Sequence, residues 1–325
     1  MADITIPIPK THGSSGSGLS SLRPLLGCAR RGYLEREVGT KNKTHDDLGE
    51  RKTDRYGKPV LDRAKVGILF ASLEEHYHGH DKCQCSFAYE DGPTDLEWTE
   101  ALRLFATYRK EVPAWIFGKI LTVEEAFAVG CDDPLNCAHA DAGGTCSEAF
   151  EATFRLGVPY FTGRLDRKSV VDSPKVVDYW AKNGGWGLEE GDILFIDSKT
   201  KKQEDSTLVL EAMERDQFMA YMMVGEWLGG QMNAKALIGN YVISTKEVKC
   251  RQVYVPKPST AQKAVLRSEL ALAWTMRSIF GDQLANPTRC LDYHQECPFY
   301  NRECDRTNDA DKLLDLARWV SENRS

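Results

Sequence analysis

The stretch "GDILFIDSKT" at residues 191–200 combines a buried-strand pattern with charged residues at its end. Apolar residues fill positions 193–196, and Asp197 and Lys199 follow two positions apart. Because side chains at i and i+2 of a strand point to the same face, the acid and the ammonium lie side by side. Charges on a buried strand are costly unless they are paired or bind something. Taken alone, the pair also fits a strand that has simply reached solvent.

A second acid, Asp166, ends the strand-like segment "GVPYFTGRLDR" upstream of Asp197. Two carboxylates at neighbouring strand ends form a hard oxygen site suited to Mg²⁺ or Mn²⁺. A lysine beside them can orient or deprotonate a metal-bound water and offset charge on a phosphate. The three residues together therefore indicate metal-assisted chemistry on a phosphate.

A glutamine and a tyrosine follow on the predicted helix 205–228, for which Asp205 or Ser206 is the expected cap. Gln217 and Tyr221 are four positions apart and so share one helix face. In that register both can reach a phosphodiester or the attacking water. Standing alone, they would be a solvated glutamine and a core tyrosine.

In this order the residues resemble the PD-(D/E)XK nuclease superfamily, in particular its RecB-like branch. That branch has a Gly-x-x-x-His-x-x-x-Glu helix, an Asp after a strand, an Asp-x-Lys strand end and a Gln-x-x-x-Tyr helix. The matches here are Gly67 with Glu75, then Asp166, then Asp197 with Lys199, then Gln217 with Tyr221. The resemblance implies a restriction-endonuclease-like core in which a mixed central sheet is flanked by helices.

The resemblance also implies a role for each residue. Asp166 and Asp197, with a backbone carbonyl at Ser198, would hold Mg²⁺ or Mn²⁺, and Lys199 would activate water. Gln217 and Tyr221 would position the substrate, and Glu75 would stand in for the family's helical histidine. That histidine falls at Ala71 here, and His76, His78 and His80 lie off its face or too far along, so we expect surface histidines.

The cysteines form a second group. "CLDYHQECPFYNREC" spaces Cys290, Cys297 and Cys304 evenly, and Cys28 lies far upstream. This layout resembles the iron–sulfur nucleases of the same superfamily, the AddB-type and CRISPR-associated exonucleases, in which a [4Fe–4S] cluster joins the two ends. Four thiolates suit such a cluster, and Zn²⁺ is the chemical alternative. The remaining cysteines are Cys83, Cys85, Cys131, Cys137, Cys146 and Cys250. We expect free thiols, with a second zinc site formed by Cys131, Cys137 and Cys146 with Cys83 or Cys85 as the alternative.

The elements that must position these residues alternate in type. Helices are predicted over residues 20–37, 64–78, 95–112 and 259–281, with strands over 114–129, 157–167, 191–200, 240–245 and 251–256. The segment 167–190 is long for a hairpin, which predicts an inserted lobe. This is an α/β pattern, with a flexible tail over 1–18 and one nuclease domain over 19–325 that carries the cysteine region 285–305.

Composition limits the function classes. A net charge of −6 argues against a nonspecific nucleic-acid coat, although a local basic groove remains compatible with it. The start "MADITIPIPK" has no apolar signal region, so a cytoplasmic protein is expected.

The resemblance implies a DNA exonuclease acting on DNA ends in recombination or repair, with a phage-encoded enzyme among the expectations. Its partners would be single-stranded or duplex DNA and a helicase or recombination protein. The alternatives are a catalytically weakened nuclease-fold DNA-binding or scaffold protein and a zinc-bearing interaction protein.

Overall fold

The computed structural model of the chain describes residues 53, 57, 59–78, 95–131, 146–202, 207–213 and 215–280. The chain divides into two compact units, of which the first contains the described residues up to 129 and residues 162–266. The described part of the second contains residues 130–131, 146–161 and 267–280. The predicted tail, the helix around Cys28 and the C-terminal cysteine region lie outside the described residues, so the predicted domain boundaries stay a prediction.

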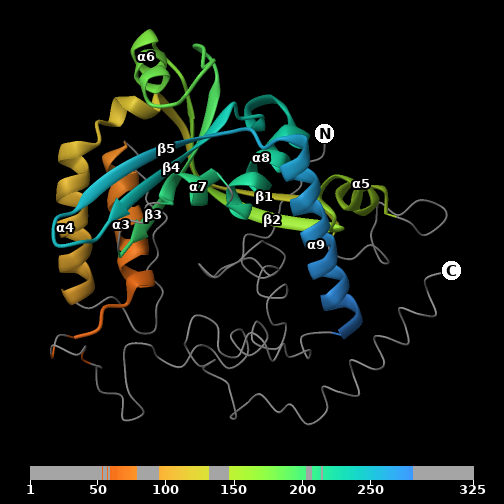
Figure 1. Cartoon of the computed structure of the whole chain (residues 1–325), viewed down its shortest axis with the longest axis horizontal. Coiled ribbons are helices and arrows are strands. Elements are labelled where there is room, and N and C mark those ends of the chain that lie inside the picture. Colours follow the sequence, from red (N-terminus) through yellow and green to blue (C-terminus); the bar gives the residue numbers. More distant parts are fainter. Residues whose placement is uncertain are drawn as a thin grey trace. The chain divides into compact units, whose positions relative to one another are not determined.

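A five-stranded mixed sheet organises the first unit (Figure 1). Its order is β1 (Lys119–Gly130), β2 (Tyr160–Val170), β3 (Ile193–Lys201), β4 (Ala236–Ile243) and β5 (Lys249–Pro256). The pairs β2–β3 and β4–β5 are antiparallel, whereas β3 and β4 are parallel. Parallel neighbours need a crossover connection, which α7 (Leu208–Met213) and α8 (Asp216–Leu228) supply. The predicted α/β class with a mixed sheet flanked by helices is confirmed.

Helices cover both faces of this sheet. On one face lie α3 (Arg63–Tyr77) and α4 (Asp95–Glu111), which pack side by side (Figure 1). On the other face lies α8, whose Phe218 packs against Gly239 of β4. The apolar stripe of α3 is buried as its helical period predicts, and it joins a core formed by Val66, Leu69, Phe70, Leu104, Ile116, Phe117, Leu194, Ile196, Ile238 and Val242.

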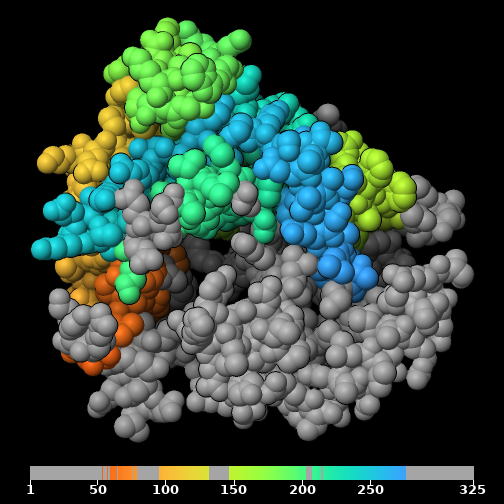
Figure 2. All heavy atoms as spheres, in the orientation of Figure 1, coloured from red at the N-terminus to blue at the C-terminus, as the bar shows by residue number. Residues whose placement is uncertain are grey.

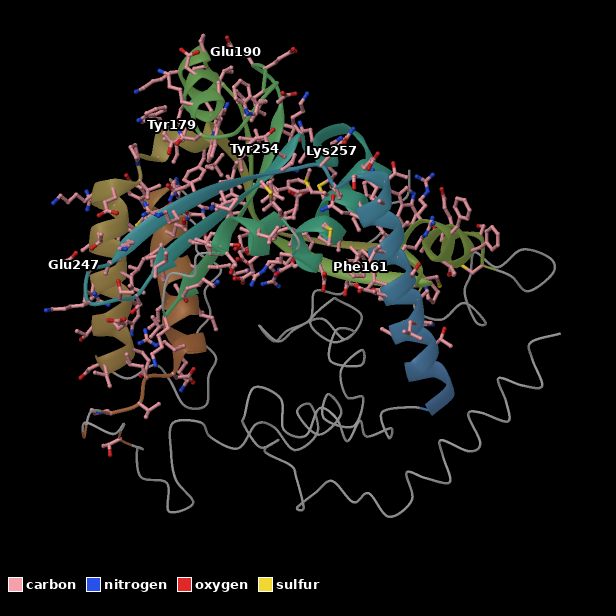
Figure 3. The ribbon with its side chains drawn as sticks, viewed as in Figure 1. Phe161, Tyr179, Glu190, Glu247, Tyr254 and Lys257 are labelled. Carbon is pink, nitrogen blue, oxygen red and sulfur yellow. The ribbon has the colours of Figure 1, made fainter. Side chains whose placement is uncertain are left out.

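The segment between β2 and β3 forms the predicted insertion, beginning at residue 171 and carrying α6 (Pro174–Lys182). Figure 2 shows this insertion projecting beyond the strands, and Figure 3 labels Tyr179 and Glu190 in it. Figure 3 also labels Glu247, which lies away from the insertion in the turn between β4 and β5. Trp180 anchors α6, because its indole N–H donates to the Ile116 carbonyl at 2.8 Å and its ring lies 6.1 Å from that of Tyr254.

The described part of the second unit contains α5 (Ser147–Leu156) and the C-terminal part of α9 (Thr260–Phe280). Gly157 ends α5 in the left-handed region with φ of 83°, and a Cβ there would lie 2.2 Å from the Arg267 carbonyl oxygen. Arg267 in turn donates to the Phe154 carbonyl at 3.3 Å. A glycine is therefore required where α5 meets α9.

One predicted helix is wrong in its continuity. The helix expected over 205–228 is divided into α7 and α8, and Arg215 between them has an extended backbone (φ −72°, ψ 115°). Residues 214–215 are not glycine or proline, so the break comes from tertiary packing rather than local propensity. Among the described residues, no helix is long and apolar enough to cross a membrane.

Candidate active site

Strand β3 separates two kinds of polar environment by simple alternation. Asp197 and Lys199 point to the face covered by α8, and Ser198 points to the face covered by α3 and α4. Lys199 Nζ lies 2.6 Å from Asp197 Oδ2, while Asp197 is almost completely buried and the Lys199 side chain is 27% exposed. The acid–lysine pair predicted from "GDILFIDSKT" is thus confirmed as a pair, with its lysine reachable from solvent.

Asp166 joins this pair from the neighbouring strand. The β2–β3 register runs from Val170 opposite Ile193 to Arg167 opposite Ile196, and Asp166 is the next residue of β2 beyond these pairs. Its Oδ2 accepts a hydrogen bond from the backbone N–H of Ser198 at 2.8 Å. The two predicted carboxylates therefore belong to neighbouring strands, but both lie within their strands and not at the strand ends that the sequence predicted.

Helix α8 brings the predicted glutamine and tyrosine to the same place. Gln217 Nε2 lies 3.5 Å from Asp197 Oδ1 and donates to the Tyr221 hydroxyl at 2.8 Å. The Tyr221 ring packs edge-on to Phe127 at 5.5 Å. A Cβ at Gly163 would lie 2.3 Å from the Phe127 ring, so this glycine of "FTGRLDR" is needed for the rings to approach β2.

Charge in this group is unevenly compensated. Burial raises the pKa of Asp197 even though the Lys199 ammonium works to lower it. Burial works to lower the pKa of Lys199, but the charges of Asp197 and Asp166 outweigh burial and raise it. Burial and the same acids also raise the pKa of Tyr221. The cations near Asp197 do not offset the cost of burying its carboxylate, so further positive charge at the site would stabilise the ionised form of Asp197.

The donor set fits a hard dication. Mg²⁺ is held by one or two carboxylates and keeps several waters, and Asp166 and Asp197 supply two carboxylates that retain unused acceptor positions. Within the described part of the chain, no cluster of three or more His, Cys, Asp or Glu side chains could hold a metal. The predicted backbone carbonyl ligand at Ser198 stays a prediction.

The opposite face of the same strands carries a buried polar network. Arg167 Nη2 donates to Glu74 Oε1 at 2.6 Å and to Ser198 Oγ at 2.8 Å. Asn240 Nδ2 contacts Glu74 Oε1 at 2.7 Å and Ser198 Oγ at 3.0 Å. The side chains of Arg167 and Glu74 are only 2% and 3% exposed. Because Ser198 also donates its backbone N–H to Asp166, the network adjoins the carboxylate site.

The helical motif is placed differently from the sequence prediction. Glu75 lies on α3, but its side chain is outside the described ones, and the buried acid of α3 is its neighbour Glu74. A Cβ at Gly67 would lie 3.2 Å from Thr200 Oγ1. Gly67 and Glu74 thus lie against the face of Ser198 and Thr200, and Ala71 is on the same helical stripe.

The prediction of a surface histidine is wrong for His78. Its ring contacts the Tyr108 hydroxyl at 3.1 Å and packs edge-on to Phe117 at 5.5 Å. Burial, with a smaller effect of the Arg167 charge, lowers the pKa of His78 to about 2. His76 is exposed as expected, and His80 lies outside the described residues.

Sequence reasoning missed two cross-strand ion pairs beside Asp166. Arg164 Nη1 lies 3.1 Å from Glu124 Oε2, and Lys168 Nζ lies 2.7 Å from Glu125 Oε2. The alternation Arg164, Asp166, Lys168 on one face of β2 was visible in "GRLDRK". The acids of β1 carried no such signal, because their partners depend on strand pairing.

The proposed cluster ligands Cys28, Cys290, Cys297 and Cys304 lie outside the described residues, as do Cys83, Cys85 and Cys137. The iron–sulfur prediction and its zinc alternative therefore stay predictions.

Comparison with known proteins gives little information about the function of this chain. No model of a known protein family matches the chain, and no curated protein matches it. The chain resembles a provisionally assigned exonuclease from Eubacterium rectale at 11% identity and a TM-score of 0.40, covering 93% of this chain and 98% of that one. It also resembles the crystal structure of SSO0001 at 11% identity and a TM-score of 0.32, covering 82% of this chain and 80% of that one. At such low TM-scores, neither likeness carries an inference about function.

Proposed function

We propose that the protein is a metal-dependent deoxyribonuclease, an exonuclease that hydrolyses phosphodiester bonds at DNA ends in recombination or repair. One observation carries the proposal. Lys199 Nζ lies 2.6 Å from Asp197 Oδ2, and Asp166 of the neighbouring strand accepts a hydrogen bond at 2.8 Å from the backbone N–H of Ser198, the residue between them in the chain. A lysine held against paired carboxylates is a suitable arrangement for bringing a water, a dication and a phosphate together.

Each side chain has a distinct part in this proposal. Asp166 and Asp197 would hold Mg²⁺ or Mn²⁺, which supplies Lewis-acid stabilisation of the phosphate charge when bound. Lys199 would orient the attacking water and carry positive charge toward the phosphate. Gln217 and Tyr221, joined at 2.8 Å, would fix the position of the reacting strand.

The cysteines belong to the proposal but not to its central observation. Cys28, Cys290, Cys297 and Cys304 would hold a [4Fe–4S] cluster or, alternatively, Zn²⁺. Cys28→Ser should lower both the iron content and the melting temperature, because losing a ligand forfeits the metal's contribution to folding. If iron content and melting temperature were both unchanged, Cys28 would not be a ligand.

The test is a cleavage assay on anaerobically purified full-length protein with end-labelled single-stranded and duplex DNA. The proposal predicts products with Mn²⁺ or Mg²⁺, none with excess chelator, and none for Asp166→Asn. A folded protein that binds DNA without cleaving it under any of these conditions would instead be a nuclease-fold binding or scaffold protein.

A further inference from the structure

Strand β1 has a backbone irregularity at Glu124, whose φ of 51° lies in the left-handed region. Among the described residues it is the one position other than glycine with a positive φ. This conformation is uncommon for a residue with a Cβ, and strained residues persist where surrounding contacts enforce them. The contacts of Glu124 therefore indicate which interactions the irregular backbone makes possible.

The irregularity turns two consecutive acids to one face. In a regular strand Glu124 and Glu125 would point to opposite faces, yet they pair with Arg164 and Lys168. These two partners are each two positions from Asp166 and share its face of β2. The backbone at Glu124 thus allows two ion pairs to flank the carboxylate of Asp166 on both sides.

The two ion pairs differ in their access to solvent. The two acids are similarly exposed, but Lys168 is only 4% exposed while its partner Glu125 is 29% exposed, so a ligand cannot reach this cation. Arg164 and Glu124 are 33% and 31% exposed, so their pair can be reached by a ligand. Burial, and then the charge of Asp166, raise the pKa of Glu124, whereas the Arg164 and Lys199 charges oppose the shift. The Arg164–Glu124 pair therefore lies within electrostatic range of the candidate site.

Arg164 keeps donors for a further partner. A guanidinium has five N–H donors in a planar fork, and within the described part of the chain its one hydrogen-bonded side chain is Glu124. Glu124 holds the guanidinium of Arg164 through Nη1, and the side chain is 33% exposed two positions from Asp166. Such an arginine suits bidentate recognition of a phosphate.

We propose that Arg164 binds a backbone phosphate of the DNA next to the scissile bond and that Glu124 is its positioning residue. The proposal rests on the nuclease function proposed above and extends it with a contact outside the four sequence motifs. Such a contact fixes the register of the strand on the enzyme and reads no base.

The first test measures binding of a short fluorescein-labelled DNA strand by anisotropy at several salt concentrations, with Ca²⁺ in place of Mn²⁺. Arg164→Ala should weaken binding about tenfold or more and reduce the slope of log K against log salt by about one. Arg164→Lys should restore the slope and only part of the affinity, because lysine cannot bind bidentately.

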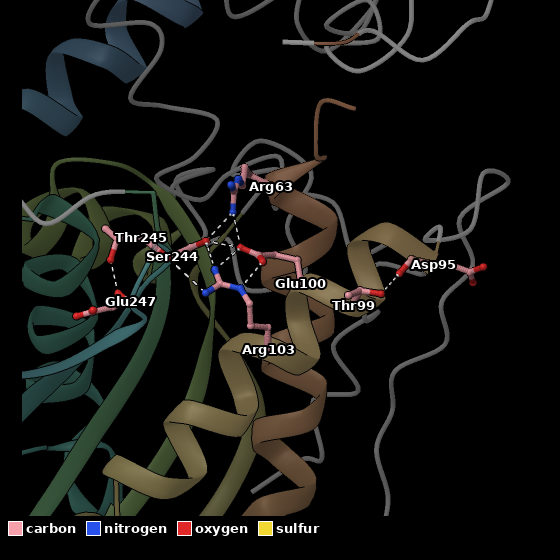
Figure 4. Close-up of polar contacts among 8 residues, drawn as sticks. All are labelled: Arg63, Asp95, Thr99, Glu100, Arg103, Ser244, Thr245 and Glu247. Atoms are coloured by element: carbon pink, nitrogen blue, oxygen red, sulfur yellow. Dashed lines mark hydrogen bonds and ion pairs between the residues drawn. The ribbon is translucent and has the colours of Figure 1, made fainter. Parts of the chain in front are cut away.

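The matched control is Arg103→Ala. Arg103 pairs with Glu100 at 2.8 Å in a cluster with Arg63 and Ser244 (Figure 4). This cluster joins α3, α4 and the end of β4, away from the carboxylates. Its loss should change neither the affinity nor the salt slope.

The second test is Glu124→Gly, which accepts the left-handed backbone and removes the whole side chain, its carboxylate included. It should leave the unfolding free energy and the salt slope as in the parent and lower kcat severalfold. An Arg164→Ala variant with the parent's affinity and slope, in a protein that cleaves DNA, would overturn this inference alone. A parent protein that neither binds nor cleaves DNA would overturn the proposed function and this inference with it.

Discussion

The two faces of β3 hold acid–cation pairs of similar chemistry in different surroundings. On one face Asp197 pairs with Lys199, whose side chain is 27% exposed. On the other face Glu74 pairs with Arg167, and both are at most 3% exposed. We call these the open pair and the closed pair. One can be reached by a substrate and the other cannot, although Ser198, which accepts a hydrogen bond from Arg167 of the closed pair, lies between Asp197 and Lys199 in the chain.

The pairs also differ in how completely their acids are satisfied. In the closed pair, Glu74 Oε1 accepts hydrogen bonds from both Arg167 and Asn240. In the open pair, Asp197 Oδ2 has the Lys199 contact, and Gln217 reaches Asp197 Oδ1 only at 3.5 Å. A buried acid that accepts two hydrogen bonds helps to fix structure, even though Arg167 Nη1 has no hydrogen-bond partner in the described part of the chain. An incompletely compensated acid such as Asp197 retains the capacity to bind. We therefore assign the closed pair to positioning and the open pair to chemistry.

The largest effect on stability is expected from breaking the closed pair. Glu74→Ala leaves the buried Arg167 guanidinium uncompensated and should lower the unfolding free energy by about 3–5 kcal/mol. Urea denaturation measures this change. Replacing both Glu74 and Arg167 by methionine should recover much of the loss, since no buried charge remains. If the single variant lost less than the surface control Glu151→Ala, which breaks an exposed pair with Arg155, the closed pair would not be a structural element.

The largest effect on chemistry short of losing the metal is expected at the open pair. Lys199→Ala should reduce kcat about a hundredfold, in the range of a lost proton-transfer or charge-stabilising group, with a smaller change in DNA affinity. Single-turnover kinetics separate the two quantities. A variant in which affinity falls and kcat stays constant would make Lys199 a binding residue.

A smaller effect on stability is expected from a change of pH, through His78, which contacts Tyr108 near the closed pair. Its pKa is lowered to about 2 in the fold and lies near 6.5 in the unfolded chain. Below pH ~6.5 the unfolded chain binds a proton that the folded chain does not, so stability should fall as the pH falls from about 6.5 toward 4.5. His78→Gln should flatten this part of the curve, measured by urea denaturation. A parent stability curve that is already flat between about pH 6.5 and about pH 4.5 would contradict a neutral His78 imidazole in the folded protein.

Much of the open pair could be predicted from the sequence because it depends on local periods. Asp197 and Lys199 share a face through the period of a strand, and Gln217 and Tyr221 through that of a helix. The closed pair could not be predicted, because Glu74, Arg167 and Asn240 meet only after strands and helices pack. For the same reason the sequence predicted Glu75 as the functional acid in place of Glu74. The two point in different directions, because consecutive residues of a helix are rotated by about 100°.

The irregularity at Glu124 and the break at Arg215 could not be predicted from the sequence either. Neither position is a glycine or proline, so nothing local marks a departure from a regular element. In both cases the backbone follows its contacts: Glu124 reaches Arg164, and Arg215 separates a helix that packs against β5 from one that packs against β4.

The central claim is that one face of β3 performs chemistry while the other maintains the fold, and one paired measurement tests it. Asp197→Asn and Glu74→Gln are each assayed for Mn²⁺-dependent DNA cleavage and for unfolding free energy. Asp197→Asn should abolish cleavage, because an amide is a poor ligand for a hard dication, without lowering stability, because burial disfavours the charged carboxylate it replaces. Glu74→Gln should lower stability and retain cleavage in proportion to the folded fraction. An Asp197→Asn variant that cleaves at the parent rate would contradict the account.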